Sequence, residues 1–104
     1  MDQTRDFHQT VVERIKREPE FAAEILRGAS ESFLQGDVDV GNSLLRDYVN
    51  GTVGFQKLAA ETGIGAKSLM RMLSPSGNPR SRNLFKVIAA LQKMSDRHIA
   101  VAAE

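Results

Sequence analysis

Apolar residues recur every three or four positions along most of the chain, which is the spacing of one face of an amphipathic helix. The alternation of apolar and polar residues that would indicate a strand does not run for any useful length. The pattern therefore predicts an all-α fold of five or six helices. Their expected positions are about residues 4–17, 19–35, 39–50, 54–62, 66–73 and 81–95.

Proline, glycine and capping residues mark the expected ends of the first three helices. Pro19 suits the first turn of the second helix, because that turn leaves its backbone N–H groups unpaired and proline has none. Gly36 is expected to end the second helix, and Asp39 to cap the start of the third. Asn50 and Gly51 tolerate a left-handed backbone, so they are expected to close the third helix.

Residues 55–74 have the pattern of two short helices that meet across a tight turn, a helix-turn-helix. Gly63 stands where the chain must turn sharply and where a left-handed backbone costs least. Ile64 fills the turn, and Pro75 disfavours helical geometry at Ser74, which ends the second of the two helices. The residues expected to face inward are Leu58, Ala59, Leu69, Met72 and Leu73.

The remaining segments complete the predicted organisation. Residues 1–36 are expected to form a helical extension that serves a dimer or a partner, and residues 37–95 the helix-turn-helix domain. Ser81 is expected to cap the last helix, and residues 96–104 to form a tail. The apolar residues expected to line the last helix are Leu84, Phe85, Val87, Ile88 and Leu91.

Charge is distributed unevenly, although the formal net charge of the 104 residues is only +1. The first 36 residues mix both signs, whereas every charged residue between Thr62 and Ser95 is positive. One-signed charge confined to a third of the chain is typical of a surface that binds a polyanion. On charge alone, a merely solvated basic surface explains it equally well. The positive residues are Lys67, Arg71, Arg80, Arg82, Lys86 and Lys93.

The composition argues against several other classes of protein. The chain has no cysteine, which excludes disulfides, thiolate metal sites and a cysteine nucleophile. No apolar run approaches the roughly 20 residues of a membrane helix, and the first residues are charged, so a cytoplasmic protein without membrane contact is expected. His8 and His98 have no ligand-spaced partners, and no set of residues assembles a nucleophile and a base. We therefore expect no metal, no cofactor and no enzymatic activity.

Residues 58–91, LAAETGIGAKSLMRMLSPSGNPRSRNLFKVIAAL, resemble a known family. They are similar to the lambda-repressor-like antidote proteins of bacterial toxin–antitoxin modules, which accompany RelE- or HigB-like toxins. The residues that carry the resemblance are the Ala60–Gly63 turn, Leu73 with Ser74, and the Gly77–Pro79 loop. Residues 22–45 resemble the leading helices of that family more loosely. The resemblance implies a lambda-repressor-like helix-turn-helix bundle with extra N-terminal helices, bound to operator DNA.

This chain departs from the family at the start of the helix that would read DNA. Family members often have Ser and Arg where Gly65 and Ala66 stand here, and the family's base contacts at those positions do not carry over. Lys67 and Arg71 lie one helical turn apart and become the candidates for base reading, because their side chains fit the edge of guanine. Ser68 and Met70 flank them, and Met70 replaces a Tyr of the family and is suited to a thymine methyl group.

Four other polar residues are candidates for contacts to DNA phosphates. Gln56 lies near the start of the first motif helix, whose end already attracts anions. Asn78, Arg80 and Arg82 lie in and after the loop, leading into the start of another helix. The alternative for the two arginines is loop solubility, and for Asn78 it is a purely local role in the turn.

These features predict a sequence-specific DNA-binding repressor, acting as a homodimer because one motif alone binds an operator weakly. The family resemblance implies an antitoxin that represses its own operon and neutralises a small basic toxin. Candidate partner residues on the second helix are Phe21, Glu24, Ile25 and Phe33. That stripe is equally compatible with intramolecular core or a dimer contact. The alternative functions are a stand-alone regulator and an interaction module without DNA binding.

Overall fold

The computed structural model describes residues 3–95, the first two of these by their backbone alone. This range folds into six helices without a strand, which confirms the predicted all-α class. The predicted tail at 96–104, with His98, lies outside the described residues. The helices are α1 (Gln3–Arg17), α2 (Pro19–Leu34), α3 (Val38–Gly51), α4 (Gly54–Thr62), α5 (Ala66–Met72) and α6 (Ser81–Ser95).

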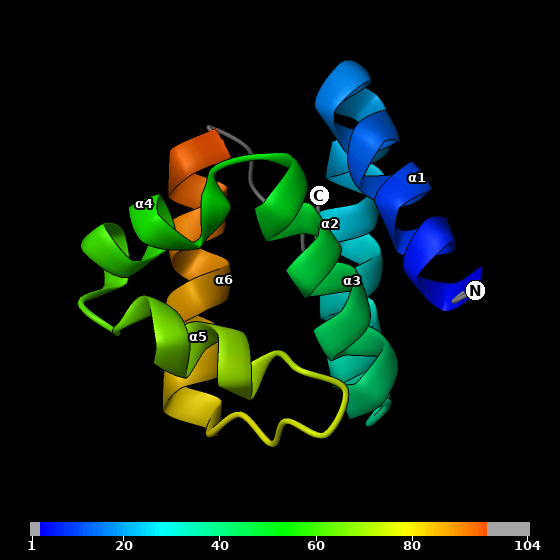
Figure 1. The fold of residues 1–104 in the computed structure, drawn as a ribbon. Coiled ribbons are helices and arrows are strands. Elements are labelled where there is room, and N and C mark those ends of the chain that lie inside the picture. Colours follow the sequence, from blue (N-terminus) through cyan, green and yellow to red (C-terminus); the bar gives the residue numbers. More distant parts are fainter. Residues whose placement is uncertain (1–2, 96–104) are drawn as a thin grey trace, which may run out of the picture.

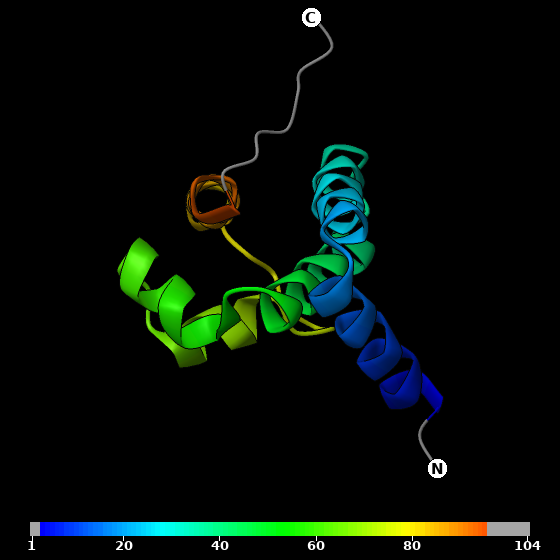
Figure 2. The ribbon, with the colours of Figure 1, turned by 90° about the horizontal axis from the view of Figure 1, so that it is seen from above.

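The helices form two groups that are joined through α3 (Figures 1 and 2). Helices α1 and α2 pack against α3 on one side, whereas α4 packs against α5 and α6 on the other. A single hydrophobic core crosses both groups, so it also crosses the predicted boundary at residue 36. Its largest fully buried side chains are Leu45, Leu58, Leu69, Leu73, Leu91, Val49 and Val87.

The start of α3 corrects one predicted cap. Asp37, not Asp39, is the N-cap residue, and its side chain accepts a hydrogen bond from the backbone N–H of Val40 at 3.4 Å. Asp39 lies in the first turn, where its negative charge favours the N-terminal end of the helix dipole. Gly36 follows the end of α2 with a φ of 86°, as predicted.

The end of α3 corrects a second prediction. Gly51 stays helical, and the left-handed residue of this corner is Gly54, with a φ of 82°. Gly51 is needed for a different reason, because a Cβ there would lie 2.6 Å from Cγ2 of Ile15. The missing side chain therefore lets α1 approach the backbone of α3 closely.

Two predictions for the last helix also change. Ser81 is already helical, and the carbonyl of Arg80 accepts the hydrogen bond of the Leu84 N–H at 2.8 Å, so Arg80 occupies the capping position. Phe85 is 60% exposed rather than part of the core, whereas its apolar neighbours on α6 are buried. None of the helices between residues 3 and 95 combines the length and the apolar character that a bilayer crossing requires.

Candidate nucleic-acid interface

The turn between α4 and α5 is fixed by backbone and side-chain hydrogen bonds. Gly63 adopts a φ of 78°, and its N–H donates to the carbonyl of Ala59 at 2.8 Å. The hydroxyl of Thr62, which is buried, donates to the carbonyl of Leu58 at 2.9 Å and accepts from the Ile64 N–H at 3.2 Å. Thr62 was not singled out by the sequence, although its position beside a turn glycine is a typical one for such a hydroxyl.

Helix α5 is anchored on one side and open on the other. Leu69 is fully buried, and Leu73 directly after the helix is also fully buried. The four predicted base readers lie on the open side: Lys67, Ser68, Met70 and Arg71 are all exposed. An α-helix that is buried on one side and exposed on the other has the geometry that the major groove of DNA accepts.

A hollow of about 380 Å³ lies between α5, the loop at 74–80 and the start of α6. Ser68 and Arg71 line it from α5, and Asn78 and Arg80 line it from the loop. The fold thus brings two predicted base readers and two predicted phosphate contacts to one concave place. Lys67, Gln56 and Arg82 are exposed outside this hollow.

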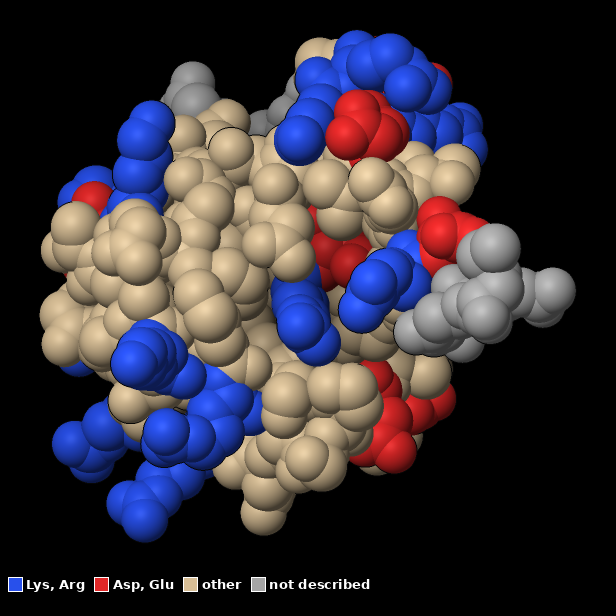
Figure 3. All heavy atoms as spheres, viewed as in Figure 1, with Lys and Arg blue, Asp and Glu red and all other residues tan. Residues whose placement is uncertain are grey.

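The positive residues of this face have no carboxylate partner among the residues that the structure describes. Figure 3 shows basic side chains gathered at the lower left, over the part of the molecule where α5 and the start of α6 lie in Figure 1. Lys93 differs, because its ammonium pairs with Glu61 at 2.9 Å, and this hydrogen bond raises the pKa of Lys93. The free basic face comprises Lys67, Arg71, Arg80, Arg82 and Lys86.

Asn42 of α3 holds the loop in place and was not found from the sequence. Its side chain is fully buried, and its Nδ2 donates to the carbonyls of Ser74 at 3.3 Å and Gly77 at 3.1 Å. Its Oδ1 is buried and has no hydrogen-bond partner among the residues that the structure describes. A Cβ on Gly77 would lie 2.3 Å from the carbonyl oxygen of Met72, so the loop is packed directly on the end of α5. The only indication of this role in the sequence was the position of the Asn42 side chain, one helical turn before the core residue Leu45.

The predicted partner residues of α2 are mostly engaged within the chain. Phe21 and Ile25 are half-buried against the core, and the guanidinium of Arg14 lies 4.0 Å from the centre of the Phe21 ring. The ring of Phe33 covers Gly41, where a Cβ would lie 2.7 Å from it. Glu24 alone is exposed. The apolar stripe therefore contributes to intramolecular packing, and of the four predicted partner residues only the acidic one is offered to solvent.

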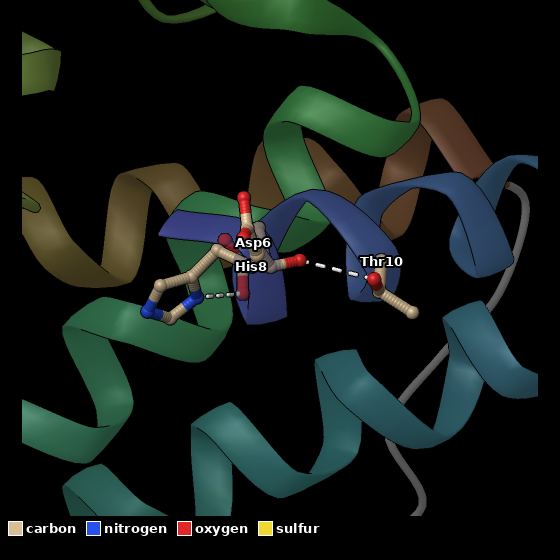
Figure 4. A network of polar contacts seen from close by, with 4 residues as sticks. Asp6, His8 and Thr10 are labelled. Carbon is tan, nitrogen blue, oxygen red and sulfur yellow. Dashed lines mark hydrogen bonds and ion pairs between the residues drawn. The ribbon is translucent and has the colours of Figure 1, made fainter. Parts of the chain in front are cut away.

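His8 has a partner that the sequence did not reveal. Its Nδ1 lies 2.7 Å from Oδ2 of Asp47 on α3, and the Asp47 side chain is only 8% exposed. Figure 4 shows the His8 ring with this contact dashed, beside the hydrogen bond that the Thr10 hydroxyl donates to the carbonyl of Asp6 at 3.0 Å. Burial raises the pKa of the Asp47 carboxyl, while the hydrogen bond from His8 and the nearby charges of His8 and Arg46 act in the opposite direction. No group of three potential metal-ligating side chains occurs in the described part of the chain.

No protein-family model, no curated protein and no solved structure matches this chain. What the exposed face does must therefore follow from the chemistry of its own side chains. That chemistry consists of lysine and arginine side chains and neutral hydrogen-bonding groups around a helix whose outer face is exposed. Among the described residues no carboxylate interrupts it by pairing with one of its cations.

Proposed function

We propose that the protein is a sequence-specific DNA-binding repressor in which α4 and α5 form a lambda-repressor-like helix-turn-helix. The observation that carries this proposal is the free basic face, whose five cations surround an exposed recognition helix without an internal counter-charge. When exposed Lys and Arg side chains neutralise DNA phosphates, the DNA releases its condensed counterions, and this release drives binding. A solvated surface of mixed sign would not provide this.

In the proposed complex α5 lies in the major groove. Lys67 and Arg71, one turn apart on its open side, donate hydrogen bonds to the O6 and N7 atoms of guanine. Met70, which is 43% exposed, contacts a thymine methyl group, and the hydroxyl of Ser68 binds a base edge or a phosphate. Leu69 on the opposite side keeps the helix seated on the core.

Phosphate contacts flank the groove in this proposal. Arg80 and Asn78 line the hollow beside α5, so a phosphate there is held between them and Arg71. Arg82 lies in the first turn of α6, where the helix dipole adds to its charge. Gln56 at the start of α4 reaches a phosphate on the other side.

A homodimer completes the proposal, because a single recognition helix buries too little surface for tight operator binding. Two copies related by a two-fold axis would read two half-sites about one helical turn of DNA apart. Sedimentation of the protein with a selected duplex measures the stoichiometry directly, and two chains per duplex are expected.

The decisive experiment selects bound sequences from a random duplex library and then compares the selected and scrambled duplexes across a salt series. Lys67→Ala and Arg71→Ala should weaken binding to the selected duplex by about 1–3 kcal/mol each. Arg80→Ala and Arg82→Ala should weaken binding to both duplexes, and each should reduce the log–log salt slope by about 0.9. Arg27→Ala, an exposed arginine on α2, is the matched control and should change neither. A library that yields no preferred sequence would contradict the proposal.

We further propose that the repressor is an antitoxin, on the basis of the sequence resemblance and of an unpaired acidic surface on α2. Glu20, Glu24 and Glu31 are exposed and outnumber the single exposed cation of this helix, Arg27. No cation pairs with the three carboxylates in the described residues. A basic partner such as a ribonuclease toxin would be attracted to them, which speeds association. Co-expression with the adjacent reading frame tests this, and a complex of the two products is expected.

The acidic surface has its own matched test. The double variant Glu24→Lys, Glu31→Lys should slow association with the partner and leave DNA binding unchanged, because both residues are far from the free basic face in sequence and lie on a different helix. Glu13→Lys on α1 provides the control charge reversal. If no partner co-purifies while DNA binding persists, the protein is a stand-alone repressor instead.

A further inference from the structure

A second hollow, of about 850 Å³, runs between α1 and α3 on the side of the molecule that carries His8. Its volume lies in the range of pockets that hold small molecules. His8 and Lys16 line it from α1, and Arg46 and Asp47 line it from α3. Pro75, at the start of the loop, lines it with exposed apolar surface, and the fully buried Leu73 borders it from behind. We call this hollow the α1–α3 groove.

One carboxylate of the groove, that of Asp47, is buried, and nearby positive charge offsets its burial only in part. Asp47 is 8% exposed at its side chain, and in the described part of the chain His8 is the one side chain that hydrogen-bonds it. Desolvation outweighs the attraction of His8 and Arg46, because the pKa of Asp47 is raised in spite of both. A buried anion in this position is stabilised by any cation that enters the groove beside it.

The same groove offers cations for an anionic group. Arg46 is exposed and has no ion pair with another described residue. Lys16 has only a loose pair with Glu13, at 3.7 Å, and each of those side chains is 54% exposed. An exposed pair of this kind contributes little, so Lys16 is readily redirected to a ligand. The lining carries charge of both signs, because Glu13 and Asp39 also contribute carboxylates and Arg5 a further cation. Within it, the partly compensated Asp47 carboxylate lies across a common space from the cations of Arg46 and Lys16.

We propose that the α1–α3 groove binds a small zwitterion of the amino-acid class. The ammonium group donates to the carboxylate of Asp47, and the carboxylate accepts from Arg46 and Lys16. The side chain of the ligand lies toward Pro75, in the loop that follows α5. Charge-assisted hydrogen bonds at both ends give such a ligand more affinity than an amine or an acid alone.

Calorimetric titration of the full chain with each standard L-amino acid tests the proposal without DNA, so its outcome is separate from that of the proposed function. At least one amino acid should bind saturably, at millimolar concentration or below. The N-acetyl and the carboxamide derivatives of that amino acid, which lack the ammonium and the carboxylate respectively, should each bind at least about tenfold more weakly.

Variants identify the site. Arg46→Ala and Asp47→Asn should each weaken binding about tenfold or more, whereas Arg27→Ala on α2 should leave it unchanged. Arg46 is exposed, so its variant is expected to fold and keeps the test decisive if Asp47→Asn is unstable. Absence of binding by every amino acid overturns the proposal. Full affinity in the Arg46→Ala variant, or for both blocked derivatives, overturns it as well.

Discussion

Replacing Asn42 by alanine tests whether a single buried amide holds the loop at 74–77 against α3. The substitution removes both hydrogen bonds that Nδ2 donates, to the carbonyls of Ser74 and Gly77. The Ser74 carbonyl keeps another partner, because it accepts the Gly77 N–H at 2.9 Å. The Gly77 carbonyl has no other hydrogen bond in the described residues, so it loses its only partner within the chain.

The expected loss follows from these contacts. Two hydrogen bonds contribute about 1–3 kcal/mol together, and a buried carbonyl without a partner costs about 1–3 kcal/mol more. Two effects reduce the total. Asn42 Oδ1 has no partner in the described part of the chain, so its removal relieves a cost, and Gly77 is only half-buried, so water can reach its carbonyl. We therefore expect Asn42→Ala to lower the free energy of unfolding by about 2 kcal/mol, equivalent to a fall of roughly 8–16 °C in Tm.

Urea denaturation followed by circular dichroism measures this loss, with an unchanged m-value as the sign that the denatured state is the same. Asn50→Ala is the control, because Asn50 is exposed on the same helix and should change stability by less than about 0.5 kcal/mol. A loss below about 0.5 kcal/mol in Asn42→Ala itself would refute the reasoning.

A second substitution at this position separates the hydrogen bonds from the volume of the side chain. Asn42→Asp keeps the shape but at neutral pH turns a carboxylate toward two carbonyl oxygens, so it should destabilise more than alanine. The pKa of that carboxyl would be raised in the folded state. The penalty is then full above the folded pKa and shrinks as the pH falls through it, when the protonated acid can donate. Equal stability of the aspartate and alanine variants at every pH would contradict this.

Four further substitutions have expected outcomes. Gly51→Ala should cost about 1–3 kcal/mol, because the new Cβ would meet Ile15 at 2.6 Å. Gly28→Ala, where the nearest atom would be at 3.7 Å, should instead stabilise α2 by about 0.5–1 kcal/mol; equal Tm shifts for the two would refute the contrast. Gly63→Ala should cost about 1–2 kcal/mol through its φ of 78° alone, and a neutral result in urea denaturation would be inconsistent with that strain. Because burial raises the pKa of Asp47, the folded state holds a proton that the unfolded state has released, so stability falls as pH rises from 3.8 to the folded pKa. Asp47→Asn should remove that acid-range slope, and an unchanged slope would contradict the assigned cause.

The sequence was sufficient for features that depend on neighbouring residues. Helical spacing predicted the all-α fold, and Gly63 with Pro75 located the turn and the end of α5 to within a residue. The exposure of Lys67 and Arg71 also followed, because the 3.6-residue period that buries Leu69 turns both of them outward. Local geometry decides all of these, so a single sequence carries the information.

Features that depend on distant partners were not predictable in this way. Asn42 and the carbonyls it holds are more than thirty positions apart, and Asp47 is thirty-nine positions from His8. Gly51 was expected to be left-handed, yet its role is set by Ile15 on another helix. Glycine and asparagine are common both at turns and at close packing points, so residue type alone does not distinguish the two uses.

The way α1 is attached has a consequence for how the molecule opens. Among the described residues α1 contributes one buried side chain, Ile15, whereas the core continues through α2 to α6 without it. Elements with few buried contacts unfold locally at a lower free energy than the whole protein. In hydrogen exchange, the amides of α1 should therefore exchange before those of α3, through openings that leave the rest folded. Each such opening exposes the backbone of α3 at Gly51, where no side chain projects. Helix α1 then packs again onto an α3 that has stayed folded.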